Sequence, residues 1–384
     1  MTAMRTQVAI IGGGPSGLLL SHLLHLDGID SIVLERHSRA YVEARIRAGV
    51  LEPGTVALLR QAGLAKRLDR EGLVHEGASF ILGEQHVRVD FAALTGHRVT
   101  VYGQTEIQKD LGDARAGTIL HEAHDVTLHD IEAAPLVRFT HNGAAHELHC
   151  DFIAGCDGFH GPSRTAIPTG VLKTWERSWP FAWLGILADV KPAADELIYA
   201  AHPRGFALAS MRSPTRSRYY IQCAPDESLE DWPDNRLWDE LRLRLGPEVT
   251  SAPSIEKSIS PLRSFVAEPM RHGRLFLAGD AAHIVPPTGA KGLNLALSDV
   301  RVLWQALATW YQRGDSAGIE AYSATCLRRV WHAERFSWWM TTLLHRVHDP
   351  AGFEHQLQRA EQDQLVTSER MRALLAENYV GLPD

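Results

Sequence analysis

The chain has 384 residues, of which 45% are hydrophobic and 22% are charged. These fractions are typical of a folded globular protein and exclude the intrinsically disordered, collagen-like and low-complexity classes. The 39 basic and 46 acidic side chains give a net charge of −7, which argues against a nucleic-acid-binding protein. At about 150 residues per domain, the length predicts two or three domains.

The cysteine pattern and the amino terminus predict a cytoplasmic protein. Four cysteines, at positions 150, 156, 223 and 326, show neither CxxC spacing nor a dense pattern, so we expect reduced thiols and no metal site. The first residues lack the apolar region of a signal peptide, and no stretch approaches the roughly 18 uninterrupted apolar residues that a membrane span needs. We therefore expect neither a membrane nor a nucleic acid among its partners.

A strand, a glycine-rich turn, a helix and a second strand open the chain. Residues 7–11 form a β-branched run that ends in Gly12-Gly13-Gly14-Pro15-Ser16-Gly17, and helical apolar spacing follows over 18–26. The second strand, 31–35, ends in an acid, Glu35. This order is typical of a dinucleotide site, in which the helix N-terminus faces the pyrophosphate and the acid binds the ribose. The unit alone does not distinguish FAD from NAD(P).

The remaining elements predict two interleaved domains followed by helices. The expected elements are a helix over 53–64, alternating strands over 80–101 and 126–149, buried strands over 150–158 and 274–279, a mostly antiparallel sheet over 179–223, and helices from about 292 to 375. We thus predict an α/β fold, in which a Rossmann-like nucleotide-binding domain is interleaved with a mostly antiparallel substrate domain. The predicted boundaries are 1–75, 97–180 and 270–300 for the first domain, 76–96 and 181–269 for the second, and 301–384 for a C-terminal helical region.

Two later segments identify the nucleotide. Cys156-Asp157-Gly158-Phe159-His160-Gly161-Pro162-Ser163-Arg164 and Leu277-Ala278-Gly279-Asp280-Ala281-Ala282-His283 resemble the paired signatures of the class A flavoprotein aromatic hydroxylases. The similarity to the members that act on 4-hydroxybenzoate continues through 45–51, 101–105, 199–206, 217–220, 286–294 and 377–383, and is weakest over 105–150 and 240–255. The resemblance covers about residues 5–383 and implies noncovalently bound FAD, which NADPH or NADH reduces.

The resemblance also implies which residues bind the two nucleotides. For FAD they are Gly12, Gly14, Ser16, Gly17, Glu35, Arg45, Arg47, Gln104, Asp157, Arg218, Asp280, Leu293 and Asn294. For the nicotinamide coenzyme they are Arg36, Tyr41, Arg47, His160, Arg164 and Arg263. The loop between Arg36 and Tyr41 departs from the best-known pattern of the family. Arg39 in this loop is a candidate for the 2′-phosphate of NADPH, but the change could equally admit NADH, so the coenzyme stays open.

Polar side chains on one predicted hairpin suit an aromatic carboxylate. Because side chains alternate along a strand, Ser210 and Arg212 share one face, and Arg218 and Tyr220 share a face after the turn at 213–215. A guanidinium binds a carboxylate through two parallel hydrogen bonds, which the serine hydroxyl and the phenol would supplement. A lone arginine of this kind lies more often on a solvated strand face. Here the positions match the carboxylate-binding residues of the family.

The resemblance further implies how the substrate hydroxyl is activated. Tyr199 and Tyr379 match two tyrosines that hydrogen-bond in series to this hydroxyl, and His75 matches the histidine at the solvent end of the series. A phenol with a pKa near 10 needs such help to ionise at neutral pH, and histidine suits the outer position. The catalytic candidates are Tyr199, Tyr379, His75, Pro287 and Asn294, and the substrate-binding candidates are Tyr199, Ser210, Arg212, Tyr220 and Pro287.

The implied reaction is the ortho-hydroxylation of 4-hydroxybenzoate to 3,4-dihydroxybenzoate in aromatic catabolism, with O₂ and NAD(P)H as co-substrates and a flavin C4a-hydroperoxide as the oxygen donor. Two alternatives remain: a hydroxylase of a different hydroxy- or aminobenzoate, and a non-catalytic carrier that shares the nucleotide-binding architecture. The aromatic stretch 330–340 predicts core packing or the face of a homodimer.

Overall fold

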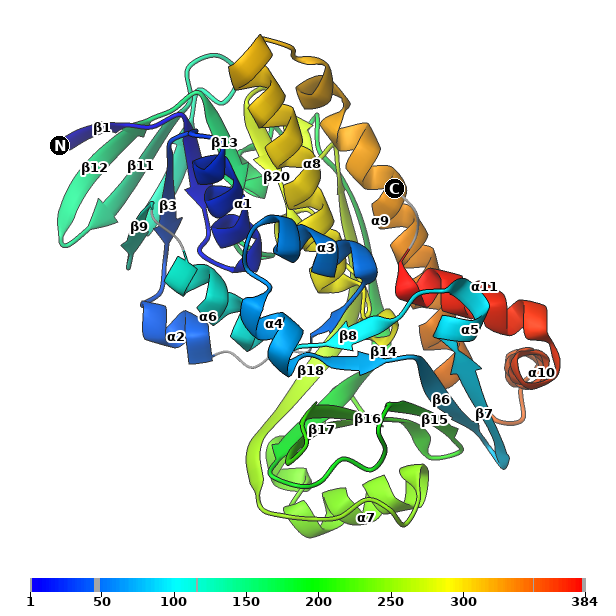
Figure 1. Cartoon of the computed structure of the whole chain (residues 1–384). Coiled ribbons are helices and arrows are strands. Elements are labelled where there is room, and N and C mark those ends of the chain that lie inside the picture. The colour runs from blue at the N-terminus through cyan, green and yellow to red at the C-terminus, as the bar shows by residue number, and fades with distance from the viewer. Residues whose placement is uncertain (1, 45–48, 115–116, 348, 382–384) are drawn as a thin grey trace.

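The computed structural model describes residues 2–44, 49–114, 117–347 and 349–381, so the expected FAD residues Arg45 and Arg47 lie outside the described residues. The described part consists of a nucleotide-binding part, a large mixed sheet and C-terminal helices (Figure 1). The N-terminal strands lie at one side of the molecule, and the last two helices lie at the opposite side.

A six-stranded sheet forms the centre of the nucleotide-binding part. Its order is β19 (Arg271–His272), β20 (Leu275–Leu277), β13 (Phe152–Gly155), β2 (Val8–Ile11), β3 (Ser31–Glu35) and β9 (Thr118–His121), and all pairs are parallel except that of β19 with β20. Every residue of β2, β13 and β20 is buried. Continuous burial is typical of parallel strands covered on both faces. Helix α1 (Pro15–Leu26) packs against β3 and against α8 (Gly292–Arg313).

Two smaller sheets and four short helices complete this part. One sheet has the order β1 (Thr2–Arg5), β12 (Ala144–His149), β11 (Leu136–His141) and β10 (His124–His129), and the other has β4 (Val50–Leu51), β8 (Val99–Val101) and β5 (Leu73–His75). The helices are α2 (Arg39–Ala44), α3 (Pro53–Gln61), α4 (Lys66–Glu71) and α6 (Gln104–Ala114). A further short helix, α5 (Phe91–Thr95), packs instead against α11 (Glu369–Val380) and β6 (Gly77–Leu82), beside the large sheet.

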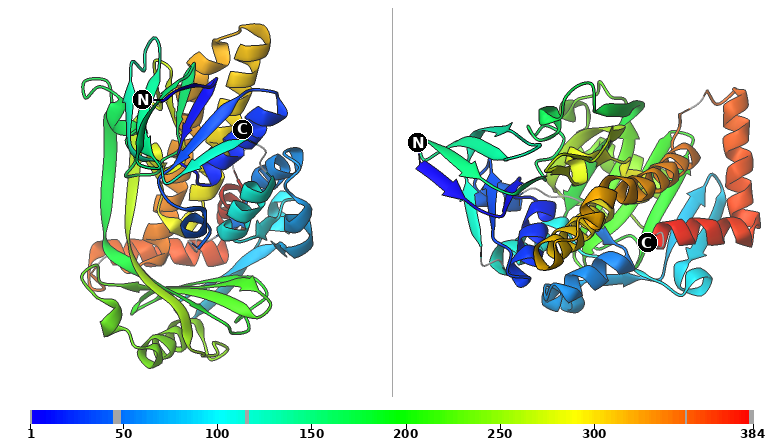
Figure 2. Two further views of the ribbon diagram at one scale, coloured as in Figure 1. Left: turned by 90° about the vertical axis from the view of Figure 1, so that its left-hand side faces the viewer. Right: turned by 90° about the horizontal axis from the view of Figure 1, so that it is seen from above.

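A large eight-stranded sheet forms the second part of the molecule. Its order is β21 (His283–Ile284), β18 (Ser254–Glu268), β14 (Lys173–Ala188), β17 (Arg216–Cys223), β16 (Gly205–Ser213), β15 (Leu197–His202), β6 (Gly77–Leu82) and β7 (Gln85–Asp90). Only β15 and β6 pair in parallel. The long strands β14 and β18 run from the nucleotide-binding part into the far end of this sheet (Figure 2).

The two faces of the large sheet have different partners. On β16, Ala207 and Ala209 belong to the cluster that packs on Trp238 of α7 (Asp234–Leu245), below the sheet in Figure 1. Phe206 and Leu208 belong to the opposite cluster. That cluster also takes in side chains from α9 (Ala317–Leu344), α10 (Phe353–Thr367) and α11 (Glu369–Val380). The helices therefore cover the face on which the candidate substrate residues lie.

The predicted α/β fold with a nucleotide-binding sheet, a mostly antiparallel sheet and C-terminal helices is confirmed. The expected strand run over 80–101 is wrong in part, because Asp90 caps α5 by accepting a hydrogen bond from the Ala93 N–H and Gly96 ends the helix at a φ of 75°. The large sheet also includes 173–180 and 283–284, which the predicted boundaries give to the first domain, and the division into domains stays a prediction. No helix in the described ranges is long and apolar enough to cross a membrane.

Candidate active site

The turn between β2 and α1 fits a pyrophosphate. Gly12 has a φ of 104°, and a Cβ there would overlap the Cys156 carbonyl, so only glycine fits this position. A Cβ on Gly17 would overlap the Gly12 carbonyl, whereas the space around Gly14 is open for at least 4 Å. Gly14 is the N-cap of α1 and gives it no side-chain cap, which leaves the backbone N–H groups of the first turn available to an anion.

Glu35 lies at the end of β3 and is 8% exposed. Its Oε2 accepts a hydrogen bond from the Gly13 N–H at 2.6 Å, and its Oε1 accepts one from the His37 N–H at 2.8 Å. A carboxylate has about four acceptor positions, so each oxygen retains one for a ribose hydroxyl. The position agrees with the predicted role, and these backbone bonds hold the carboxylate in one orientation.

Asp157 follows β13 and provides a further acceptor for the cofactor. Its Oδ2 accepts a hydrogen bond from the Ser163 N–H at 2.8 Å, but its Oδ1 is buried without a partner among the described residues. Burial raises the pKa of this carboxyl. Such an orphaned oxygen requires a donor, and hydroxyls of a bound nucleotide are suitable donors. Together with the first turn of α1, this oxygen shows that the described residues fit FAD.

The other expected FAD residues lie on separate elements. Gln104 begins α6, and Asp280 lies in the short turn Gly279–Ala281 before α8. Leu293 and Asn294 lie in the first turn of α8, where backbone N–H groups lack helical partners. The Asn294 side chain is not available to a flavin, because it bonds to the backbone of residues 50, 52 and 290 and to the Thr55 hydroxyl. Its expected contribution therefore comes from its backbone.

Arg212 is a guanidinium without a carboxylate partner. It forms no ion pair with any of the described residues. Its Nη1 donates to the Ser210 hydroxyl at 2.9 Å and to the Met211 carbonyl at 3.1 Å, whereas its Nε is buried with no partner. Burial lowers the pKa of Arg212. A cation in these surroundings is costly unless an anion joins it, so the geometry predicts an anionic ligand.

The expected convergence of the hairpin is present. Ser210 pairs with Arg218 across β16 and β17, and Leu208 pairs with Tyr220, so these side chains share a face with Arg212. Arg218 lies over the Tyr220 ring at 5.2 Å and donates to Glu256 on β18 at 3.0 Å. The guanidinium of Arg218 thus already has an acid within the sheet, and its expected contact with FAD stays a prediction.

Two buried tyrosines meet at the other end of this face. The Tyr199 and Tyr379 hydroxyls are 2.6 Å apart, and each residue is 2% exposed. Tyr199 stacks on Phe80 and Tyr379 stacks on Phe91, which fixes both rings. Burial raises the pKa of each tyrosine, so both hydroxyls are protonated at neutral pH and can pass a proton between them.

His75 ends β5 and is 1% exposed. Both of its ring nitrogens are buried without a hydrogen-bond partner. Burial lowers the pKa of His75, while the charges of Glu196 and Asp195 oppose this shift. The ring is therefore neutral and has both a free donor and a free acceptor. Its expected connection to the tyrosine pair stays a prediction.

Pro287 lies in the turn Pro287–Gly289, between β21 and α8. Its carbonyl accepts a hydrogen bond from the Ala290 N–H at 3.0 Å. Pro287 is exposed, whereas Thr288 and Gly289 are buried, so the turn presents the proline outward from a packed base. A carbonyl has a second lone pair, which leaves Pro287 able to accept from a ligand.

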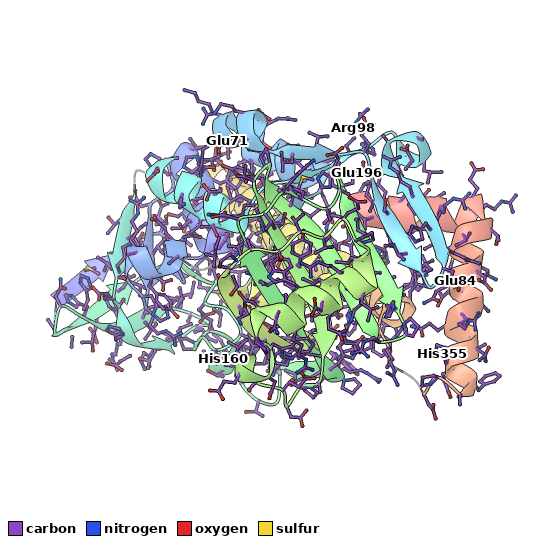
Figure 3. The ribbon with its side chains drawn as sticks, turned by 90° about the horizontal axis from the view of Figure 1, so that it is seen from below. Glu71, Glu84, Arg98, His160, Glu196 and His355 are labelled. Atoms are coloured by element: carbon purple, nitrogen blue, oxygen red, sulfur yellow. The ribbon has the colours of Figure 1, made fainter. Side chains whose placement is uncertain are left out.

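Three expected coenzyme residues gather around Phe159. The Arg164 and Arg263 guanidinium carbons lie 4.6 and 4.5 Å from the centre of its ring, and the His160 ring packs edge-on against it. Arg164 also donates to the carbonyls of Phe159 and Ala281. His160 and Glu196 lie at opposite edges of the molecule in Figure 3. The coenzyme cluster is therefore remote from the carboxylates near His75.

The remaining coenzyme candidates follow β3. Arg36 and Tyr41 are exposed, and Tyr41 stacks on His37 with ring centres 4.1 Å apart. Arg39 is also exposed and is paired with Glu43 and Asp113. A phosphate at Arg39 has to compete with these two acids. The coenzyme contacts of all six described residues stay predictions.

One functional cluster was not found by sequence reasoning. Lys291 is 3% exposed, and its Nζ donates to Glu52 at 2.6 Å and to the Tyr379 carbonyl at 3.0 Å. Arg329 donates to the other oxygen of Glu52 at 2.9 Å. Burial lowers the pKa of Lys291, and Glu52 opposes this shift. The only signal in the sequence was Lys291 itself, which lies within the segment 286–294 of the family resemblance. A lysine alone does not indicate which acid it pairs with.

The comparisons with known proteins identify the family of this chain. Residues 5–337 match the FAD binding domain family. The chain belongs to this family and, within it, to the flavoprotein aromatic hydroxylases. The p-hydroxybenzoate hydroxylase of Acinetobacter baylyi is 55% identical over 100% of this chain and 97% of its own length. The 3-(3-hydroxy-phenyl)propionate/3-hydroxycinnamic acid hydroxylase of Burkholderia cenocepacia is 28% identical over 79% of this chain and 57% of its own length.

Solved structures confirm the fold. The p-nitrophenol 4-monooxygenase of Pseudomonas putida covers 100% of this chain and is covered over 100% of its own length, with a TM-score of 0.85 at 20% identity. The predicted membership of the flavoprotein aromatic hydroxylases, the predicted fold and the predicted FAD cofactor are thus confirmed.

Proposed function

We propose that this protein hydroxylates 4-hydroxybenzoate at the carbon next to its hydroxyl, consuming O₂ and one NAD(P)H. The products are 3,4-dihydroxybenzoate, NAD(P)⁺ and water, so one oxygen atom enters the ring and the other is reduced by the two electrons of the coenzyme. The observation that carries this proposal is that one face of the sheet has a cation at one end and a pair of hydroxyls at the other. Arg212 lacks an anion, and Tyr199 with Tyr379 offers a hydroxyl pair.

The spacing of these ends suits a para-substituted ring. Tyr199, Leu208 and Tyr220 are register partners on three neighbouring strands. At about 4.8 Å per strand, the backbones of the two tyrosines are about 10 Å apart. Arg212 lies four residues beyond Leu208 along β16, and its long side chain reaches back over Ser210. A flat ring with a carboxylate at one end and a hydroxyl at the other fits between them.

Binding begins at the carboxylate. Arg212 would donate to the carboxylate from Nε and Nη2, and the Ser210 hydroxyl, which accepts from Nη1, would turn its own proton to the ligand. Tyr220 on the adjacent strand closes the same face. Hydrogen bonds to charged groups contribute about 1.5–3 kcal/mol each, so this end supplies most of the orientation of the ring.

The hydroxyl end then loses a proton. Tyr199 accepts the proton of the substrate phenol and passes its own proton to Tyr379. The two hydroxyl oxygens are 2.6 Å apart, so the proton moves within one hydrogen bond. A phenolate pushes more electron density into the ortho carbon than a phenol does, and this carbon is the one that receives oxygen. Neutral His75, with both nitrogens unpartnered, is the proposed outer acceptor.

FAD, when bound, supplies the electrons taken from the coenzyme and delivers the oxygen atom. The chain holds it with the first turn of α1, Glu35, Asp157 and the first turn of α8. The positive end of α8 would favour negative charge on the reduced ring. The proposed role of the Pro287 carbonyl is to accept a hydrogen bond from the substrate hydroxyl, and its second lone pair supports this role.

The proposed setting is a homodimer in the cytoplasm. All four cysteines are free and buried, which suits a reducing compartment. Within the aromatic stretch, Phe336 and Met340 are in the core, whereas Trp331 and Trp338 are 40% and 37% exposed. Trp331 packs edge-on against Trp175, which is 53% exposed. This apolar face suits a second copy. Light scattering should return twice the chain mass of 42.6 kDa.

The test of the proposed function is oxidation of NADPH and NADH by the purified yellow protein with a panel of acids. The panel comprises 4-hydroxybenzoate, 3-hydroxybenzoate, 4-aminobenzoate and no addition, with product identification by chromatography. Coenzyme oxidation stimulated by 4-hydroxybenzoate and about one 3,4-dihydroxybenzoate per coenzyme are expected. A different preferred acid would support the alternative hydroxylase, and a colourless, inactive protein would support the carrier.

A further inference from the structure

The second half of α9 contacts both sides of the candidate active site. His345, directly after the helix, packs on the face of the large sheet opposite α7, and Thr341 contacts the Pro287–Gly289 turn. Both residues are 0% exposed. Neither side chain reaches a substrate or a cofactor by the contacts described above. Their hydrogen bonds nevertheless join the two structures that hold the substrate and the flavin.

His345 fixes the end of α9 to the sheet. Trp183 on β14 donates from its indole N–H to Nε2 of His345 at 2.7 Å. An indole nitrogen only donates, so Nε2 must be an acceptor and the proton of the neutral ring is on Nδ1. Nδ1 then donates to the Thr341 carbonyl at 3.0 Å. Burial lowers the pKa of His345 to about 3, which keeps the ring neutral at working pH.

Aromatic packing connects the His345 contact with Trp183 to the candidate substrate residues. The His345 ring stacks on Phe206 at 4.2 Å and on Phe181 at 4.6 Å. Trp183 packs against Tyr220 with ring centres 5.0 Å apart, and Phe206 packs against Tyr199 at 6.3 Å. The end of α9 is therefore held by the same rings that support both ends of the proposed substrate site.

Thr341 fixes the turn on the other side. Its hydroxyl lies 2.7 Å from the Ser337 carbonyl and 3.0 Å from the Thr288 hydroxyl. Thr341 is the donor in both contacts, so its single proton is shared between the Ser337 carbonyl and the Thr288 hydroxyl. Thr288 is 0% exposed and directly follows Pro287. The contact therefore orients the peptide unit whose carbonyl faces the proposed substrate hydroxyl.

Close packing leaves the turn little freedom on this side. A Cβ on Gly289 would lie 2.7 Å from the Ser337 hydroxyl and 3.2 Å from the Phe336 ring, so only glycine allows α9 to approach so closely. The Ala290 N–H bond to Pro287 closes the turn. The hydroxyl pair of Thr288 and Thr341 is a directional contact in this apolar packing.

We propose that Thr341 is a positioning residue for the hydroxylation. Its contact with Thr288 fixes the position of the Pro287 carbonyl. Its own carbonyl accepts from His345, which fixes the same segment to the large sheet. This role rests on the proposed function. Loss of the hydroxyl contact lets the turn shift relative to the substrate ring, so electrons from the coenzyme reach O₂ without oxygen entering the ring, and hydrogen peroxide forms instead.

The experiment compares three variants of the full-length holoenzyme. Thr341→Val keeps the shape and loses the hydroxyl, Thr341→Ser keeps the hydroxyl, and Thr342→Val is the control. The Thr342 hydroxyl bonds only to carbonyls of its own helix, at Trp338 and Trp339. Product formed per coenzyme consumed should fall by about twofold or more in Thr341→Val, because small misplacements of reacting groups cause large losses of rate. Thr341→Ser and Thr342→Val should match the wild type.

A second readout does not depend on turnover. Amide hydrogen exchange of the full chain, followed by mass spectrometry, reports the Ala290 N–H that closes the turn. The peptide covering 286–292 should exchange faster in Thr341→Val and as in the wild type in the other two. Thr288→Val should reproduce the effect, and the double variant should be no worse than either single one, because both remove the same contact.

The outcomes separate this inference from the proposed function. If Thr341→Val keeps both the wild-type coupling and the wild-type exchange, or if Thr342→Val loses coupling equally, Thr341 does not position the turn. A wild-type protein that makes no hydroxylated product from 4-hydroxybenzoate refutes the function, while the exchange data still decide whether Thr341 holds the turn. Faster exchange at 286–292 with unchanged coupling also overturns the positioning role.

Discussion

Arg212→Ala tests the part of the site that selects the substrate. In the wild type Arg212 is half-buried, its Nε is buried without a partner among the described residues, and no acid among those residues pairs with it. Removal of the side chain leaves the substrate carboxylate facing Ser210 and Tyr220 alone. We expect saturable binding of 4-hydroxybenzoate to be lost over the usual concentration range, while the FAD content stays normal.

The size of the effect follows from the contacts. Truncation of one partner of a buried charge pair costs about 2–5 kcal/mol, which corresponds to a rise in Kd of roughly 30-fold to a few thousand-fold. Arg212→Lys retains the charge but loses the two-pronged geometry, so it should fall between the wild type and Arg212→Ala. Removal of a buried, unpaired cation also relieves a cost in the ligand-free protein, so the thermal stability of Arg212→Ala should not decrease.

The assay is titration of the flavin absorbance with 4-hydroxybenzoate and with 4-hydroxybenzamide, its neutral analogue. The matched control is Arg216→Ala on the adjacent strand β17, because Arg216 is exposed and paired with Asp189. The control should bind the acid as the wild type does, and Arg212→Ala should lose its preference for the acid over the amide. An unchanged acid affinity in Arg212→Ala would show that the carboxylate binds elsewhere.

Four further outcomes are expected. Tyr199→Phe should bind the substrate but leave it protonated near neutral pH, so the product formed per coenzyme falls. If the variant binds the phenolate and couples normally, the tyrosines only shape the pocket. Arg39→Ala should lower the kcat/KM ratio of NADPH to NADH by about three- to tenfold if the guanidinium leaves its two acids for the 2′-phosphate, and a constant ratio makes it a surface ion pair only. Glu35→Ala should weaken FAD, which acid or heat releases unmodified from the wild type; an unchanged FAD affinity would contradict the ribose role. Burial raises the pKa of Glu334 from 4.5 to about 7, so the folded protein binds the extra proton and the free energy of unfolding falls as pH rises from 4.5 to 7. Glu334→Gln should therefore gain up to about 3 kcal/mol at pH 8 and nothing below pH 4.5 in denaturant unfolding, and an equal gain at both pH values would refute the assignment.

The nucleotide-binding unit could be predicted because its constraints are local. The left-handed Gly12 and the close approach of Gly17 are needed within a few residues of each other, so they leave a continuous pattern in the chain. The hairpin of β16 and β17 could be predicted for the same reason, since strand alternation alone puts Ser210 and Arg212 on one face. In both cases the sequence carries the geometry over short distances.

The rest of the site depends on contacts between distant residues. Tyr199 and Tyr379 are 180 positions apart, and Lys291 is 239 positions from Glu52. No spacing rule relates such pairs, so the first was available only through the family resemblance and the second was missed. Strand β18 and helix α7 were also missed, because β18 has an irregular burial pattern and α7 buries only one side of a mostly polar sequence.

The two ends of the proposed substrate site belong to the same packed sheet, and this determines which ring acids the site excludes. Arg212 and Tyr199 lie on neighbouring strands of a sheet whose far face is packed on α7, so their separation cannot adjust to the ligand. A ring with its hydroxyl at the meta position satisfies either the guanidinium or the tyrosine, but not both. The unmatched end then leaves a buried polar group without a partner, which costs about 1–3 kcal/mol and more for the charged end. We therefore expect selectivity for the para acid to come from the stiffness of the sheet rather than from an additional contact.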